Sequence, residues 1–194
     1  MKKVEIELFR FHELEQHVQE KLIQQEADVD TSHVYEDARE TVDKFLELFP
    51  DLATGNRSWL EPVTHYMHPN IMQMEGLRLQ KWLVNNLWND IYRPKYTYKP
   101  GNRRNRRSNC QVESVCPLTG VCYDHYILMP IMDVIKWKSD HTHTTMDMLI
   151  SDCFERLRMT INNEVEYLTS AESIKDMLRC NGLWYTKYGQ VIHL

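Results

Sequence analysis

The chain has 194 residues, 42% of them hydrophobic, and a formal net charge of −5. This length and composition allow one buried core, so we expect a single domain over residues 1–194. No apolar run approaches the roughly 20 residues of a membrane-spanning helix. The charged and apolar residues at the start also alternate, unlike those of a signal peptide. An odd number of cysteines, five, favours reduced thiols and a cytoplasmic protein.

The beginning of the chain predicts a strand followed by two helices. Apolar and charged residues alternate over residues 4–8, the period of a strand with one buried face. Apolar residues then recur at spacings of three and four over residues 12–26. A second such stripe follows Asp30 or Thr31, either of which can cap a helix, and Pro50 stops it. We expect the two helices to pair as a hairpin.

The centre of the chain predicts one buried helix between irregular segments. Residues 52–69 lack periodicity and are expected to form a loop. Apolar residues cover more than one face over residues 71–91, which indicates a central helix. The basic stretch 91–110 has turn residues in its middle and predicts a long hairpin or a flexible loop. A short strand is expected over residues 111–115.

The third part of the chain predicts two helices. Residues 126–137 are apolar enough for a buried helix, in which Pro130 is expected to occupy the first turn. A long amphipathic pattern then runs from about Thr145 to Leu168.

The C-terminal region, residues 145–194, ends in a short helix and a hairpin. Thr169 and Glu172 have the spacing of a capping box, and Gly182 is expected just past the end of this helix. Its inward residues are expected to be Ile174, Met177 and Leu178. Residues 183–186 and 190–194 predict a terminal β-hairpin. The chain is therefore expected to be α+β and helix-rich, with a small antiparallel sheet and a C-terminal β-hairpin.

The two expected N-terminal helices form a strongly acidic region, residues 12–50. From His12 to Asp51 the sequence has twelve acidic residues and three basic ones. Four carboxylates recur at helical spacing in the second helix: Glu36, Asp37, Glu40 and Asp43. Such a row can imitate phosphates and occupy the basic groove of a nucleic-acid enzyme. The alternative is that these residues form the solvated side of a helical hairpin.

The stretch from Ile91 to Cys110 has the opposite charge, with seven basic residues and no acidic one. Its basic residues are Arg93, Lys95, Lys99, Arg103, Arg104, Arg106 and Arg107. Basic side chains neutralise phosphates, while Tyr92, Tyr96 and Tyr98 could stack on bases. Three interpretations stay open: a solvated loop, a nucleic-acid-binding segment and a contact for an acidic protein partner.

Four residues have the chemistry of zinc ligands but not the usual spacing. Cys110, Cys116 and Cys122 are six residues apart and His125 follows. Because no paired C-x-x-C element is present, half-buried thiols are favoured over a metal site. The spaced pairs His141 with His143 and His65 with His68 are expected to be polar loop residues, with Thr144 or Thr145 as a helix cap.

Motifs for catalysis are lacking in this sequence. It contains no G-x-S-x-G elbow, no phosphate-binding glycine loop and no dinucleotide fingerprint. We therefore expect a protein without catalytic residues and without a cofactor.

Three segments resemble a family of small proteins from phages and mobile elements of Gram-positive bacteria, which are often labelled antitoxin-like. The segments read FRFHELEQHVQEKLIQQ, CPLTGVCYDHYILMPIMDVIKW and EVEYLTSAESIKDMLRCNGLWYTKYGQVI. They are similar to that family's F-x-E-L start, its C-x-L-T-G-x-C segment and its closing helix with a hairpin. The chain departs from the family at His12, where Asp is common, and in its arginine-rich insert.

This resemblance implies an accessory protein that acts in the host bacterial cytoplasm by binding a host or defence component. It implies no catalytic residue. The first functional hypothesis is a protein-binding inhibitor, for example of a CRISPR nuclease. The alternative hypothesis is a nucleic-acid-binding module that uses residues 91–110.

Overall fold

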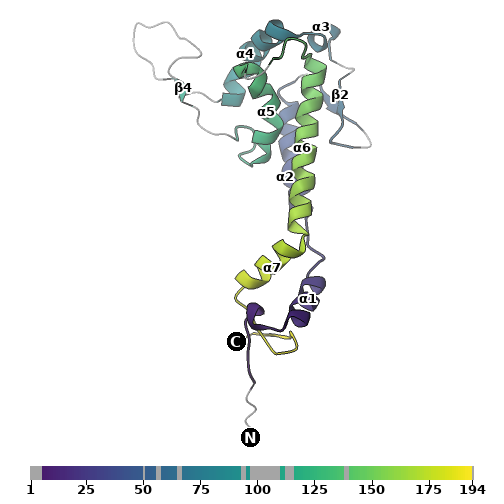
Figure 1. The fold of residues 1–194 in the computed structure, drawn as a ribbon. Helices are drawn as coiled ribbons and strands as arrows, with labels where there is room; N and C mark the ends of the chain where they lie inside the picture. The colour runs from purple at the N-terminus through teal and green to yellow at the C-terminus, as the bar shows by residue number, and fades with distance from the viewer. Residues whose placement is uncertain are drawn as a thin grey trace. The chain divides into compact units, whose positions relative to one another are not determined.

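The computed structural model describes residues 6–49, 51–55, 58–64, 67–92, 95–96, 110–111, 116–137 and 140–193. The architecture is α+β and helix-rich, as predicted (Figure 1). Its strands form separate two-stranded antiparallel sheets: β1 pairs with β2, β3 with β4, and β5 with β6. None of the helices in these described ranges is long and apolar enough to cross a membrane.

The contacts divide the chain into two compact units, where the sequence predicted one domain. The terminal unit combines Met1–His33 with Asn162–Leu194, and the central unit is Val34–Ile161. The helix α6, Met146–Leu168, contributes residues to both units.

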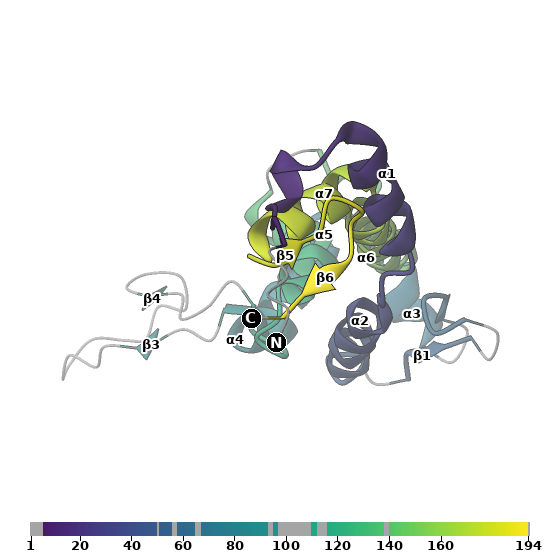
Figure 2. The same ribbon diagram turned by 90° about the horizontal axis from the view of Figure 1, so that it is seen from below.

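The terminal unit is built around a small core that both ends of the chain share. Its elements are the 3-10 helix η1 (Phe11–Glu13), α1 (Gln16–Gln25), α7 (Ala171–Cys180), β5 (Trp184–Tyr185) and β6 (Val191–Ile192). Helices α1 and α7 pack against each other (Figure 2). The core residues are Phe11, Leu14, Val18, Leu22, Ile174, Leu178 and Tyr185.

The start of the terminal unit differs from the prediction. Of the strand expected over residues 4–8, residues 4–5 lie outside the described ranges and residues 6–8 are not a strand. Phe9 makes a single antiparallel bridge with Tyr185. The predicted helix 12–26 is interrupted, because Leu14 has extended backbone angles and ends η1 before α1 begins.

The two acidic helices were predicted to pair as a hairpin, but their apolar faces pack against other elements. The apolar stripe of α1, with Val18 and Leu22, is covered by Ile174 and Leu178 of α7. Helix α2 (Ser32–Leu46) instead packs within the central unit. Periodicity shows that a stripe is buried but not which element buries it.

The end of the chain follows the prediction closely. Helix α7 is capped by Ser170, whose hydroxyl accepts a 3.2 Å hydrogen bond from the Ser173 N–H, one residue later than the predicted Thr169. Gly182 follows the helix with a φ of 67°, which favours glycine. The terminal hairpin is confirmed, with Trp184 opposite Ile192. Met177, expected to point inward, is 44% exposed.

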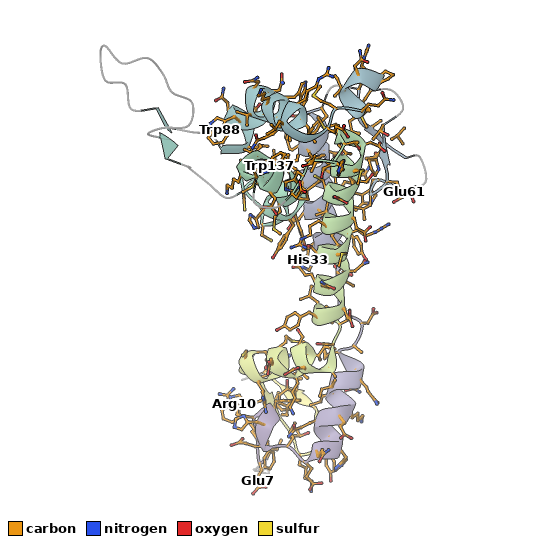
Figure 3. The ribbon with its side chains drawn as sticks, turned by 45° about the horizontal axis from the view of Figure 1, so that its top comes forward. Glu7, Arg10, His33, Glu61, Trp88 and Trp137 are labelled. Atoms are coloured by element: carbon orange, nitrogen blue, oxygen red, sulfur yellow. The ribbon has the colours of Figure 1, made fainter. Side chains whose placement is uncertain are left out.

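Arg10 attaches the N-terminal segment to this hairpin (Figure 3). Its guanidinium lies 3.7 Å from the centre of the Trp184 ring and donates to the carbonyl of Gly182. Its backbone N–H donates to the Glu13 carboxylate at 2.6 Å. These contacts fix the segment around Arg10 on the C-terminal hairpin.

The central unit packs α2 with the helices α4 (Gly76–Tyr92), α5 (Tyr123–Lys136) and the first part of α6. An aromatic cluster holds α2 against α6, because the rings of Phe45 and Phe154 meet edge to face at 5.7 Å. The helices α4 and α5 also pack on each other.

Two helices of the central unit differ from the prediction in their bounds. The helix expected over residues 71–91 is split into α3 (Pro69–Met72) and α4. Gly76 has a φ of 55° at the break, and a Cβ there would lie 3.1 Å from the Thr142 carbonyl oxygen. Helix α5 begins three residues earlier than expected, so Pro130 lies inside it and not in its first turn. Pro130 therefore leaves the Tyr126 carbonyl without its helical donor.

The strands of the central unit are short. The predicted loop 52–69 contains β1 (Ala53–Thr54) paired with β2 (Pro62–Val63). The strands β3 (Lys95–Tyr96) and β4 (Cys110–Gln111) pair antiparallel, so the two ends of the basic stretch lie side by side. Of the strand expected over residues 111–115, residues 112–115 lie outside the described ranges.

Candidate protein-binding surface

Helix α2 presents one buried face and one charged face. Asp30 stabilises its start by accepting a 2.9 Å hydrogen bond from the Ser32 N–H, and this bond lowers the pKa of Asp30. The face toward the core consists of Val34, Ala38, Thr41, Val42 and Phe45. Because α-helical positions repeat every 3.6 residues, the acidic residues fall on the outer side.

The acidic stripe, defined as Glu36, Asp37, Glu40 and Asp43, lies on this outer side. Three of its residues are exposed and Asp37 is half-buried. Within the stripe, Glu36 and Glu40 are four residues apart, and Glu40 is three from Asp37 and from Asp43. Like charges at these spacings repel each other. No hydrogen bond or ion pair holds these four carboxylates in the described part of the chain.

The nearest lysine on α2 is engaged elsewhere. Lys44 donates a 2.8 Å hydrogen bond to Glu47, and this bond raises the pKa of Lys44, with a smaller contribution from Glu40. Both side chains of this pair are about half exposed or more. Arg39 is also exposed, three residues after Glu36 and four before Asp43, so this side of α2 has four acidic residues and two basic ones and a net negative charge that faces solvent.

A groove of about 600 Å³ adjoins the C-terminal end of α2; we call it the acidic groove. It is formed by the end of α2, the residues after it, α3, α4 and the loop before α5. Its lining residues are Lys44, Glu47, Leu48, Phe49, Asp51, Met67, Ile71, Trp82, Asn86, Leu87, Asn89, Asp90, Pro117 and Leu118.

The floor of the acidic groove is apolar and aromatic. Phe49 and Trp82 stack with ring centres 6.3 Å apart and planes 15° from parallel. Phe49, Met67 and Leu87 are buried, whereas Trp82 is only half-buried. The indole of Trp82 is therefore the aromatic surface that a ligand can reach.

The rim of the acidic groove has three carboxylates, Glu47, Asp51 and Asp90, and one amine, Lys44. Asp51 and Asp90 are exposed, and neither forms an ion pair or hydrogen bond in the described ranges. Asp51 has a φ of 74°, a conformation that Asp tolerates better than other non-glycine residues. The groove thus has a net negative rim over an apolar floor.

One wall of the acidic groove is held by a buried carboxylate. Asp124 is fully buried at the start of α5. Its Oδ2 accepts the backbone N–H groups of Leu118, Thr119 and Gly120 at 2.8, 2.7 and 3.0 Å. Its Oδ1 accepts the Thr119 hydroxyl at 2.7 Å and the Thr41 hydroxyl at 3.2 Å.

The Asp124 network has a structural consequence for both surfaces. It fixes the loop that supplies Pro117 and Leu118 to the groove, and through Thr41 it joins this loop to the inner face of α2. The sequence prediction did not include Asp124 or Thr41. The sequence feature that could have indicated this network is an Asp four residues after a Thr-Gly turn, because such an Asp can accept hydrogen bonds from the backbone N–H groups of the turn.

The basic segment contributes no described side chain to these surfaces. Lys95 and Tyr96 are described as the strand β3 by their backbone alone. The other predicted contact residues lie outside the described ranges: Arg93, Tyr98, Lys99, Arg103, Arg104, Arg106 and Arg107.

The predicted cysteine and histidine group is only partly described. The backbone N–H of His125 donates to the Cys116 thiol, and burial raises the pKa of that thiol. Within the described ranges no three His, Cys, Asp or Glu residues are placed to hold a metal ion. The side chain of Cys110 lies outside these ranges, and Cys116 and Cys122 form no disulfide within them.

The spaced histidines and threonines have local roles. His68 caps α3, because its Nδ1 accepts a 3.2 Å hydrogen bond from the Asn70 N–H. Thr145 accepts from the Met148 N–H at 3.3 Å at the start of α6, as predicted for a cap. His141 lies 3.4 Å from the Thr144 hydroxyl and contacts the edge of Trp137. His65 lies outside the described ranges.

Comparison with protein-family models, with curated proteins and with solved structures yields no match.

Proposed function

We propose that this chain is a non-catalytic, protein-binding accessory protein of a phage or mobile element. It inhibits a host or defence factor that handles nucleic acid, for example a CRISPR nuclease, or neutralises a toxin as an antitoxin does. The acidic stripe of α2 lies in the basic groove of that partner and takes the place of phosphates. The chain acts in the host cytoplasm and needs no cofactor.

The observation that carries this proposal is the unpaired charge of the acidic stripe. A helix rises about 1.5 Å per residue, so Glu36 and Asp43 are about 10 Å apart along α2. A nucleic-acid strand has one phosphate per about 3.4 Å of axis, which gives about three charges over the same length. The four carboxylates therefore match the charge density of a single strand.

The stripe is also unfavourable for the folding of the isolated chain. Three pairs at i,i+3 or i,i+4 spacing repel each other, and although Arg39 and Lys44 stand at attractive spacings from the stripe, neither forms an ion pair with it in the described part of the chain. If the face only had to stay in contact with water, a mixture of acidic and basic residues at these four positions would be sufficient. A basic partner surface supplies the missing counter-charges.

Capture from a bacterial lysate tests the proposal. The tagged wild-type chain is compared with the stripe variant Glu36→Gln/Asp37→Asn/Glu40→Gln/Asp43→Asn, with and without nuclease treatment. A control variant of equal charge change, Glu20→Gln/Glu26→Gln/Asp28→Asn/Glu166→Gln, alters the terminal unit instead.

We expect a nucleic-acid-binding protein that stays bound after nuclease, is displaced by added DNA and is retained by the control variant. The stripe variant should lose it. Equal capture by the wild type and the stripe variant would refute the proposal.

A second candidate function is nucleic-acid binding by the basic segment 91–110. It is favoured by the pairing of β3 with β4, which brings both ends of this segment together as a hairpin does. Binding to a generic DNA duplex should then weaken steeply with salt, because each phosphate contact releases counterions. Affinity that does not depend on salt would exclude this candidate.

A further inference from the structure

We propose that the acidic groove binds an arginine side chain projecting from the basic surface of the partner. This inference rests on the proposed function and adds to it the chemistry of a second contact point. The groove and the stripe both belong to the central unit, and Lys44 and Glu47 line the groove on the last turn of α2 and just beyond it.

The charge of the rim selects a cation. Glu47, Asp51 and Asp90 outnumber the one amine, and Lys44 already donates to Glu47. Asp51 and Asp90 have no ion-pair or hydrogen-bond partner in the described ranges. A guanidinium entering here meets two carboxylates that lose no contact with a described residue, whereas a phosphate or an acidic peptide is repelled.

The floor of the groove favours arginine over lysine. The half-buried indole of Trp82 offers an aromatic surface, and tryptophan is the best aromatic partner for a cation. A planar guanidinium is more weakly hydrated than an ammonium and stacks on such a surface. Apolar lining residues such as Met67 and Leu87 suit the methylene stem of the same side chain.

The position of the groove fits a partner that already lies along α2. The stripe ends at Asp43, and the rim residue Glu47 follows it after four residues, about one further helical turn. A basic surface that pairs with the stripe can thus extend one arginine into the groove. The contact in the groove, at Asp51 and Asp90, then adjoins the contact with the stripe.

The test is an NMR titration of the full chain with a short peptide, GSRLRSG, and with analogues in which both arginines are lysine or citrulline. We expect the indole N–H of Trp82 to shift with the arginine peptide. The lysine peptide should bind about threefold more weakly. The uncharged citrulline peptide should not bind.

Variants locate the site. Asp51→Asn/Asp90→Asn should weaken the arginine peptide about fivefold, the combined effect of two exposed ion pairs. Asparagine also tolerates the left-handed backbone of position 51. The control Glu26→Gln/Asp28→Asn makes the same charge change in the terminal unit and should leave the affinity unchanged. Trp82→Phe keeps an aromatic ring opposite Phe49 and should weaken binding by about twofold.

Several results would overturn the inference: equal binding of the citrulline peptide, no shift at Trp82, or unchanged affinity after Asp51→Asn/Asp90→Asn. The lysate capture separates this failure from that of the proposed function. If the stripe variant loses the partner and the groove variant keeps it with unchanged affinity, only the arginine site is wrong. If the peptide binds as expected and the stripe variant still captures the partner, only the proposed role of the stripe is wrong.

Discussion

Neutralising the acidic stripe should make the chain more stable and at the same time unable to bind its partner. The variant Glu36→Gln/Asp37→Asn/Glu40→Gln/Asp43→Asn keeps side-chain size and nearly the same helix propensity. It removes like-charge repulsion and, in the described ranges, no hydrogen bond or ion pair. Stability and binding therefore change in opposite directions.

The size of the stability gain follows from the spacing. Three repulsive pairs at about 0.2–0.5 kcal/mol each are partly offset by the attractive spacings of Arg39 with Glu36 and Asp43 and of Lys44 with Glu40, so the net gain is at most about 1 kcal/mol in dilute buffer. For a chain of this length, that corresponds to a rise in Tm of at most about 2–4 °C. The gain should shrink in about 1 M salt, where the Debye length falls to about 3 Å. Capture of the partner should fall by at least about a hundredfold, because close charge pairs across interfaces contribute strongly.

Thermal unfolding followed by circular dichroism, at low and at high salt, measures the first effect, and quantitative capture measures the second. A drop in Tm would show that the carboxylates make stabilising contacts, contrary to the structure. An unchanged affinity would show that the stripe is only a solvated helix face, and would refute the reasoning.

Two further experiments, urea unfolding of variants and thiol labelling, test the interior of the central unit and of α6. Asp124→Ala should destabilise the chain by about 3 kcal/mol or more, because several buried donors lose their acceptor, and Thr41→Val should destabilise it by about 1 kcal/mol, because one hydrogen bond is lost. Urea unfolding measures both changes, and equal midpoints for Asp124→Ala and the wild type would contradict the network. Iodoacetamide at about pH 8 should label the exposed Cys122 and Cys180 of the native chain but not Cys153, because full burial raises the pKa of the Cys153 thiol and keeps it protonated. Mass spectrometry identifies the labelled cysteines, and rapid labelling of Cys153 in the native chain would contradict this expectation.

The fold could be predicted wherever one periodic pattern covered a whole element. The stripe of α6 and the hairpin β5–β6 follow from local spacing and turn residues, and both were predicted. The break between α3 and α4 could not be predicted. It depends on Gly76 meeting the Thr142 carbonyl, a contact between residues far apart in the sequence.

The acidic stripe could be predicted in position but not in surroundings. Helical spacing alone predicts that Glu36 and Asp43 lie on one face of a helix, and in the structure both lie on the exposed face of α2. The acidic groove could not be predicted, because Asp51, Asp90 and Leu118 come from three separate segments. Charge patterns show which residues repel, whereas a cavity depends on how distant segments pack.

The hydrogen bond from Thr41 to Asp124 has a consequence for the thermodynamics of association. It fastens the inner side of α2 to the loop that carries Leu118, so the outer carboxylates are presented on a stiff support before any encounter. A surface that is already ordered loses little conformational entropy when it docks. Tight binding can then be reached with a small contact area and without remodelling of the backbone.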